Sequence, residues 1–289
     1  MMKMLSHKQT ITNSSQISAY FDEQYQAYWC LMHAAPRPCF SSQLLSEFSE
    51  FYKRLKKEIA TSSNGPSFKY LILASDLQGV FNLGGDLELF VKLIRSKDRD
   101  GLASYAKSCI DLIYANLSFQ CSGITSISLV QGDALGGGFE TALSSDVLIA
   151  ERSAKMGLPE ILFNLFPGMG AYSLLSRKIG ASQAERMILS GRIYTAEELY
   201  EMGVVDVLAE DMQGEMAVYD YIRKEERSLN GCQAFRKVKS ICNPVTYKEL
   251  NNIVDIWVDA ALQLNKQDLR MMERLAARQS AIAQNTAQR

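Results

Sequence analysis

Hydrophobic positions follow two patterns that alternate along the first half of the chain. A continuous apolar run of strand length occurs at residues 70–74, as is typical of a strand buried on both faces, and residues 124–130 and 147–150 predict two further strands of this kind. Between the first two runs, helical spacing recurs at residues 86–96 and 100–118. This order predicts an α/β fold with a largely parallel sheet. Ligands usually bind at the carboxyl ends of such strands, so we expect the functional residues on the loops there.

The segments before the first buried strand carry weaker patterns. Aromatic and aliphatic residues at 20–32, interrupted by polar residues at 22–24, predict a β-hairpin or a pair of short strands. Apolar positions from Leu44 to Ile59 recur at helical spacing and predict a helix with one buried face. Residues 1–15 show no apolar periodicity, and we expect them to form a flexible N-terminal arm.

The pattern becomes mostly helical from Thr195 onward. Thr195 and Glu198 have the spacing of a capping box, a strand-like run follows at 204–208, and the last helical segment covers about 246–284. These patterns divide the chain into three parts. They are the arm, a core and a C-terminal helical region, at residues 1–15, 16–195 and 196–289.

Composition and charge exclude several classes of protein. The chain has 31 Lys and Arg against 32 Asp and Glu, so no overall positive field would attract nucleic acid or an anionic membrane. No apolar stretch approaches the roughly 20 residues of a membrane-spanning helix. The six cysteines show no paired short spacing, and residues 1–15 are mostly polar rather than signal-like. We therefore expect a cytoplasmic protein with free thiols that binds neither nucleic acid nor membrane.

The residue types present also limit the chemistry. The only histidines are His7 and His33, too few for a histidine-built metal site and poorly suited to a Ser-His-Asp arrangement. Cys109 and Cys121 have no histidine nearby in the sequence and are expected to be inert thiols. Residues 168–173 imitate the start of a dinucleotide fingerprint, but the last glycine is missing. We expect no metal and no tightly bound cofactor, so carboxylates must carry any acid–base chemistry.

Glycines gather where the first two buried strands end. Gly84 and Gly85 follow the first strand, and Asp86 is placed to cap the next helix. Residues 136–138 are three glycines that follow the second strand and open a helix. Bare backbone N–H groups at a helix start can bind a ligand oxygen, which is one way to build an oxyanion hole.

Two glutamates lie beside these loops. Glu140 falls in the first turn after the triple glycine, and Glu160 follows Pro159 beyond the third strand. Each feature alone has an ordinary explanation, since glycines permit a tight helix–strand crossing and most glutamates lie on the surface. Their recurrence at successive strand ends favours one shared site.

The order and spacing of these segments resemble the crotonase, or enoyl-CoA hydratase/isomerase, superfamily. The resemblance rests on residues 84–86, 136–140 and 159–161 and covers about 20–285. It implies a crotonase (ClpP-like) spiral of ββα units with a C-terminal helical region. It also implies a homotrimer or a dimer of trimers, in which residues 196–289 serve as a trimerisation surface or lid.

The resemblance assigns roles to residues of this chain. The amides of Gly85 and Gly137 would form the oxyanion hole, and Glu140 and Glu160 would be the catalytic acid–base pair. The implied substrate-binding residues are Gly84, Gly136, Met169, Trp257 and Leu275. The last three would line an acyl tunnel, with plain core packing as the alternative for each. No cofactor is implied beyond the acyl-ACP or acyl-CoA thioester that carries the substrate.

Several stretches are similar to one branch, the bacterial diffusible signal factor (DSF) synthases. They are residues 81–90, 129–142, 157–173, 256–259 and 272–275. That branch implies synthesis of cis-2-unsaturated fatty acid quorum-sensing signals from 3-hydroxyacyl groups on acyl carrier protein (ACP), by dehydration and thioester hydrolysis. It also implies association with a sensor kinase.

Two other functions remain open. A catabolic enoyl-CoA hydratase or isomerase would use the same oxyanion hole and both carboxylates. A module that binds a signalling partner would need neither. The acyl chain length and the choice of acid and base are also open.

Overall fold

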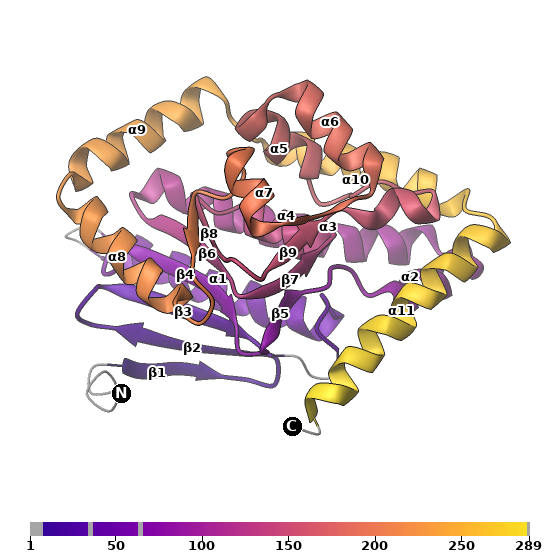
Figure 1. Ribbon diagram of the computed structural model, residues 1–289, viewed down its shortest axis with the longest axis horizontal. Helices are drawn as coiled ribbons and strands as arrows, with labels where there is room; N and C mark the ends of the chain where they lie inside the picture. Colours follow the sequence, from indigo (N-terminus) through magenta and orange to yellow (C-terminus); the bar gives the residue numbers. More distant parts are fainter. Residues whose placement is uncertain (1–7, 34–36, 63–65, 288–289) are drawn as a thin grey trace.

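Two β-sheets organise the protein. The computed structural model describes residues 8–33, 37–62 and 66–287. In that part of the chain the larger sheet has seven strands in the order β1-β2-β3-β4-β6-β8-β11 (Figure 1). These are β1 (Lys8–Asn13), β2 (Ile17–Asp22), β3 (Ala27–Met32), β4 (Tyr70–Ser75), β6 (Thr125–Val130), β8 (Val147–Glu151) and β11 (Val207–Ala209). The smaller sheet has the order β10-β9-β7-β5, from β5 (Gly79–Asn82), β7 (Gly132–Leu135), β9 (Lys155–Gly157) and β10 (Ile193–Thr195).

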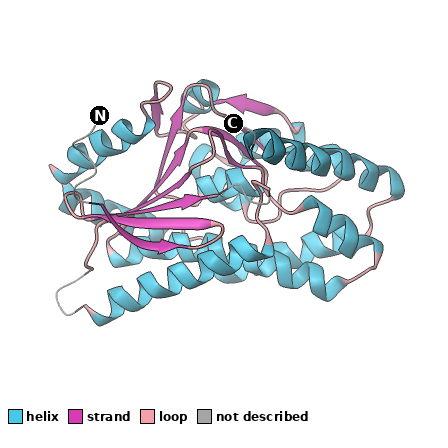
Figure 2. Cartoon of the chain, turned by 90° about the horizontal axis from the view of Figure 1, so that it is seen from below, coloured by secondary structure: helices cyan, strands magenta, loops and turns pink. Residues whose placement is uncertain are grey.

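Helices cover these strands on both sides (Figure 2). The α-helices are α1 (Ser42–Thr61), α2 (Leu87–Arg95), α3 (Arg99–Ser118), α4 (Gly137–Leu143), α5 (Ala171–Ile179), α6 (Ala181–Ser190), α7 (Ala196–Glu201), α8 (Gly214–Glu226), α9 (Leu229–Cys242), α10 (Tyr247–Leu262) and α11 (Lys266–Ala287). Two 3-10 helices are η1 (Phe119–Ser122) and η2 (Pro159–Phe163). No helix in the described ranges combines the length and apolar character needed to cross a lipid bilayer.

The predicted buried strands form the centre of the larger sheet. From β3 through β4, β6 and β8 to β11, every neighbouring pair is parallel. All residues of β6 and β8 are buried, as predicted for strands covered on both faces. The predicted hairpin at 20–32 is also confirmed, since β2 and β3 pair antiparallel. The helices predicted before, between and after these strands are present, and the Thr195 capping box forms at α7.

A second strand follows each of three central strands. β5 follows β4, β7 follows β6 and β9 follows β8, and these second strands run parallel in the smaller sheet. Helical turns then follow as α2, α4 and η2. This repetition confirms the predicted spiral of ββα units. The sequence did not predict the smaller sheet because its strands are short and interrupted by glycines. Gly132 lies against the backbone of Gly79, so a side chain there would collide with the neighbouring strand.

The segment expected to be an arm contains a strand. Residues 8–13 form β1 and pair antiparallel with β2 through a register shift, while residues 1–7 lie outside the described ranges. The buried carboxylate of Glu47 holds the connecting turn, because it accepts hydrogen bonds from the Ser15 hydroxyl (2.7 Å) and from the amides of Gln16 (2.9 Å) and Ile17 (3.1 Å). The expectation of a flexible arm was therefore wrong for residues 8–13. The strand was missed because its residues are mostly polar.

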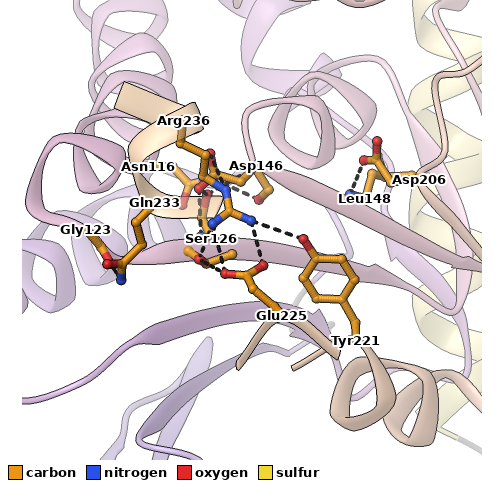
Figure 3. A network of polar contacts seen from close by, with 12 residues as sticks. Asn116, Gly123, Ser126, Asp146, Leu148, Asp206, Tyr221, Glu225, Gln233 and Arg236 are labelled. Atoms are coloured by element: carbon orange, nitrogen blue, oxygen red, sulfur yellow. Dashed lines mark hydrogen bonds and ion pairs between the residues drawn. The ribbon is translucent and has the colours of Figure 1, made fainter. Parts of the chain in front are cut away.

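A buried ion-pair network attaches α8 and α9 to the larger sheet (Figure 3). Arg236 of α9 donates to the carboxylate of Glu225 on α8 (2.6 Å) and to the hydroxyl of Thr125 on β6 (2.8 Å). Its Nε lies 3.8 Å from Asp146, which precedes β8. Since α9 has no buried residue of its own, this polar network fixes its position.

The two last helices bring the end of the chain back to the core. α10 packs on α3, and α11 runs along α2 and against η2. They are separate helices, because Asn265 caps α11 by accepting from the amides of Gln267 (2.7 Å) and Asp268 (3.2 Å). Their inner faces reach the region where the glycine-rich loops end. The division of the chain at residue 195 remains a prediction.

Candidate active site

A cavity of about 290 Å³ lies where the two glycine-rich loops, η2 and the C-terminal helices meet. Every residue that the sequence analysis assigned to the site lines this cavity. They are Gly84, Gly85, Gly136, Gly137, Glu140, Glu160, Met169, Trp257 and Leu275. The structure therefore brings together residues that are up to 191 positions apart in the chain, from Gly84 to Leu275. Their catalytic and binding roles remain predictions.

Glycine is required in both loops. Gly84 and Gly136 have φ values of +87° and +52°, a conformation that residues with side chains rarely adopt. A Cβ on Gly84 would lie 2.7 Å from the carbonyl oxygen of Leu135. A Cβ on Gly136 would collide with the carboxylate of Glu160. The loops thus pack backbone against backbone, with Glu160 directly against one of them.

The amides of Gly85 and Gly137 are available to a ligand. Among the described residues, neither N–H donates a hydrogen bond. The preceding amides are already used, since Gly84 donates to the side chain at the end of β5 (2.8 Å) and Gly136 donates to a β9 carbonyl (2.9 Å). Gly137 also begins α4, so its N–H points out of the helix start. These contacts fix the loops and leave two donors beside the cavity.

Glu140 is buried but held by amides. Its residue is 1% exposed, and its Oε1 accepts hydrogen bonds from the amides of Met169 (2.8 Å) and Ala171 (2.9 Å). Burial raises the pKa of Glu140 above its ordinary value, while the two amide donors oppose that shift. The negative form of Glu140 therefore has specific stabilisation from the chain around the start of α5.

Glu160 has less support for a negative charge. It follows Pro159 at the start of η2, and its Oε2 is buried and accepts no hydrogen bond from the described residues. Burial raises the pKa of Glu160, and the nearby charge of Glu140 raises it further. Because the two groups oppose each other's ionisation, the geometry favours a charged Glu140 and a protonated Glu160. The cavity thus offers a proton acceptor and a proton donor together.

The remaining walls are largely apolar. The ring of Trp257 packs edge-to-face on Phe90, with 5.0 Å between centroids. A Cβ at Gly168 would lie 2.5 Å from the Trp257 ring, and one at Gly137 would lie 2.5 Å from the Met169 sulfur. These glycines let large apolar side chains approach the site. The cavity therefore has the chemistry to hold an acyl chain beside polar groups.

Some lining residues were not predicted. Gln279 is 5% exposed, and its side-chain amide donates to the carbonyls of Leu83 (2.9 Å) and Gly85 (3.1 Å). The available signal was its spacing, four residues after Leu275 on the same helix face. Tyr105 also lines the cavity, and its hydroxyl accepts from the amide of Asp86 (3.0 Å).

Nothing in the described residues suggests metal or thiol chemistry. No group of three or more His, Cys, Asp or Glu side chains in those ranges could hold a metal ion. His33 contacts Asp76 and does not line the cavity, and His7 lies outside the described residues. Cys109 lines the cavity, but burial raises the pKa of its thiol far above neutrality. All six cysteines are free thiols, as expected.

Comparison with known sequences identifies a family pattern. A family model described as enoyl-CoA hydratase/isomerase matches residues 38–256. Mouse mitochondrial methylglutaconyl-CoA hydratase is 34% identical over 166 residues, which is 57% of this chain and 51% of that protein. The fatty acid oxidation complex subunit alpha of Pseudomonas syringae is 31% identical over 177 residues, 61% of this chain and 23% of that protein. The chain thus spans about half or less of these relatives' lengths.

Comparison with solved structures confirms the fold. An enoyl-CoA hydratase from Bacillus halodurans superposes with a TM-score of 0.73 at 20% identity, covering 94% of this chain and all of that chain. Pseudomonas aeruginosa DspI superposes with a TM-score of 0.68 at 22% identity, covering 85% of this chain and 97% of that one. At such identities the likeness establishes the α/β crotonase fold with C-terminal helices and no more.

Proposed function

The chain belongs to the enoyl-CoA hydratase/isomerase family, the crotonase superfamily, and from this premise we propose that it makes cis-2-unsaturated fatty acid signals of the DSF family. Its substrate would be a 3-hydroxyacyl thioester on ACP, and its two activities would be dehydration and thioester hydrolysis. The observation that carries this proposal is the pair Glu140 and Glu160 on one largely apolar cavity, beside two amides that have no acceptor among the described residues. The resemblance of several stretches to the DSF synthases adds to it.

Dehydration begins with loss of the α-proton. The thioester oxygen gains negative charge as that proton leaves, and the amides of Gly85 and Gly137 are available to bind it. Fixed donors in a dry site need no rearrangement during the step, and removing one such donor typically raises the barrier by about 3–4 kcal/mol. The glycine-rich loops thus supply the stabilisation that makes the α-hydrogen acidic.

The two glutamates complete the elimination. Glu140, as carboxylate, takes the proton from C2 while the C2–C3 double bond forms. Glu160, as acid, gives its proton to the departing 3-hydroxyl, which leaves as water because hydroxide is a poor leaving group. This assignment follows from the amide donors on Glu140 and the unpartnered oxygen on Glu160. The cis double bond would come from an acyl chain bent about C2–C3 by the cavity walls.

Hydrolysis would then restore both groups. After dehydration Glu140 carries a proton and Glu160 is charged. Glu160 can remove a proton from water as the water oxygen attacks the thioester carbonyl, and the same amides can bind the tetrahedral oxyanion. The carbon–sulfur bond breaks, and the leaving thiolate takes the proton of Glu140. The cycle needs no serine or cysteine nucleophile.

Single substitutions of the glutamates test this proposal. Glu140→Ala and Glu160→Ala should each abolish formation of free cis-2-enoic acid from 3-hydroxydodecanoyl-ACP, as followed by mass spectrometry. Circular dichroism should show an intact fold in both. Cys109→Ala is the matched control, because this residue lines the same cavity and has no proposed role. Full activity of either glutamate variant would disprove the proposal.

A second candidate is hydration or isomerisation of an enoyl-CoA. The curated relatives favour it, since one is named methylglutaconyl-CoA hydratase at 34% identity. Parallel assays with crotonyl-CoA and with 3-hydroxydodecanoyl-ACP distinguish the two functions. Rapid hydration of the first without hydrolysis of the second would support the catabolic activity.

We also propose a homotrimer or a dimer of trimers. Support comes from α9, where Phe235, Val238 and Ile241 are exposed apolar side chains at spacings of three residues. Large exposed apolar side chains in a row are typical of interfaces between proteins. Light scattering would give the mass in solution, and a monomer would contradict the assembly. A sensor kinase partner is a further proposal, which a pull-down with the Glu160→Ala variant would test.

A further inference from the structure

The last helix holds the loop that carries the proposed oxyanion amide. Gln279 of α11 donates from one nitrogen to the carbonyls of Leu83 and Gly85, at 2.9 and 3.1 Å. These two carbonyls flank the loop whose Gly85 N–H faces no acceptor among the described residues. The Leu83 carbonyl belongs to the peptide before Gly84 and the Gly85 carbonyl to the peptide after Gly85. A bridge between them restrains the planes on both sides of the Gly84–Gly85 peptide, and therefore the direction of the Gly85 N–H.

The other end of the same amide has no partner. Oε1 of Gln279 is buried and accepts no hydrogen bond within the described ranges, although the residue lines the cavity and is only 5% exposed. The amide cannot reverse to relieve this, because Oε1 would then face two carbonyl oxygens that need donors. A buried acceptor in a fixed direction is unfavourable until a donor reaches it. The cavity is where a donor would arrive.

We propose that Gln279 is a positioning and specificity residue. Its nitrogen holds the Gly85 amide in place, and its Oε1 accepts a hydrogen bond from a donor carried by the bound thioester. Two donors lie close to a thioester carbonyl, the 3-hydroxyl of the acyl group and the first amide N–H of the pantetheine arm. This inference rests on the proposed function for the nature of the ligand.

The positioning role is tested by Gln279→Glu. This change keeps the size of the side chain and replaces the donating nitrogen by an oxygen. We expect kcat with 3-hydroxydodecanoyl-ACP to fall at least tenfold while KM changes less than threefold, because the amide matters most as charge develops. Relative to wild type, activity should recover on acidification, since a protonated carboxyl can donate again.

The matched control is Glu273→Ala on the same helix. It removes the ion pair with Arg95 (2.7 Å), which ties α11 to α2 outside the cavity. Its kcat should stay within twofold of wild type. Equal losses in both variants, or a loss in Gln279→Glu that follows its thermal unfolding without pH recovery, would overturn the positioning role.

The acceptor role is tested by binding. Dissociation constants are measured in a Glu160→Gln background, with and without Gln279→Met, for four twelve-carbon thioesters. The 3-hydroxydodecanoyl N-acetylcysteamine thioester carries both donors, its 3-deoxy analogue has only the amide, the 3-hydroxy S-ethyl thioester has only the hydroxyl, and the plain S-ethyl thioester has neither.

If Oε1 accepts a hydrogen bond from one of these donors, removing that donor from the thioester should weaken binding about tenfold when Gln279 is present. The same removal should weaken binding by less than twofold in Gln279→Met. One comparison is between thioesters with and without the 3-hydroxyl, and the other is between thioesters with and without the amide. The comparison that shows this difference identifies the donor. If neither comparison shows the difference between Gln279 and Gln279→Met, the acceptor role is wrong. If wild type binds these thioesters but turns over none, the proposed function fails while the binding result for Gln279 stands.

Discussion

Two regions of this protein treat their buried carboxylates in opposite ways. Under α9, Glu225 is buried against Arg236, and this cation holds the pKa of Glu225 below its ordinary value (Figure 3). In the cavity, Glu140 and Glu160 have no cation partner among the described ion pairs, and burial raises the pKa of both. The first region uses charge to fix a helix, whereas the second keeps a proton available. Burial alone therefore does not mark a functional carboxylate, because the cations and other donors around a buried carboxylate decide whether its pKa falls or rises.

Supplying that cation should have the largest effect. Leu275→Lys would place an ammonium group in the cavity that the two glutamates share. A cation favours both charged carboxylates, so the proton donor would be lost. We expect turnover of 3-hydroxydodecanoyl-ACP to fall about 10²–10⁴-fold, the usual contribution of general acid–base catalysis. Leu275→Met controls for packing and should keep most activity. Equal activity of the two variants would contradict the comparison.

Removing the cation from the other region should have the next largest effect. Arg236→Met leaves Glu225 buried without its partner and should lower the free energy of unfolding by about 3–5 kcal/mol in urea titration. Adding Glu225→Gln should recover part of this loss, because the isolated charge is then gone. Arg223→Met, on an exposed arginine of α8, is the control and should change stability by less than about 1 kcal/mol. If Arg236→Met left the free energy of unfolding unchanged, the ion pair would contribute little to stability.

The pH dependence of stability should differ between the two regions. The raised pKa of the cavity pair means that the native state holds protons which the unfolded chain releases above the ordinary value of 4.5. Stability from this pair is therefore present below 4.5 and is lost as pH rises, by up to about 1.4 kcal/mol per pH unit for each glutamate. Glu225 has a lowered pKa, so its contribution is present above 4.5 and is lost on acidification.

Urea titrations between about pH 5 and pH 7 would measure the cavity contribution. The Glu140→Gln/Glu160→Gln double variant should lose the fall in stability with rising pH that wild type shows. An unchanged slope would mean that the pair titrates alike in the folded and unfolded states.

The smallest predicted effect concerns another buried carboxylate, Glu47. Glu47 has no cation partner among the described ion pairs, but hydroxyl and amide donors lower its pKa to about 2 even though burial opposes the shift. Glu47→Gln should lower the free energy of unfolding by about 1–2 kcal/mol, and wild type should lose this contribution between pH 4.5 and 2. Hydrogen exchange should report faster opening of β1 and β2, with Glu50→Gln as an exposed control. Unchanged exchange would show that donors alone do not hold this turn.

Features within short stretches of sequence were predictable. The buried strand β4 is rich in apolar residues, β6 and β8 each contain a short apolar stretch, and glycines at a strand end have few explanations. Glu140 and Glu160 could be chosen because each lies close to such a loop or strand end. Their separate roles were not predictable, because these depend on the amides of Met169 and Ala171, which belong to another segment.

Features that depend on contacts between distant segments were missed. β1 is polar, and its place in the sheet depends on Glu47, more than thirty residues away. In the sequence, Gln279 looks like any polar residue of an amphipathic helix. Its contacts with Leu83 and Gly85 form only because α11 packs along α2. The role of Arg236 likewise depends on its contact with β6, which forms only when α9 lies over the sheet.

The contact between Gly137 and Met169 makes the site sensitive to the chemical state of one thioether. The methionine sulfur lies so close that a single methyl group on Gly137 would come within 2.5 Å of it. Conversion of this thioether to a sulfoxide would place a strong acceptor oxygen next to the Gly137 N–H, where it would compete with the thioester oxygen. Peroxide would then inhibit the activity while both glutamates remain chemically intact, and methionine sulfoxide reductase would restore the activity.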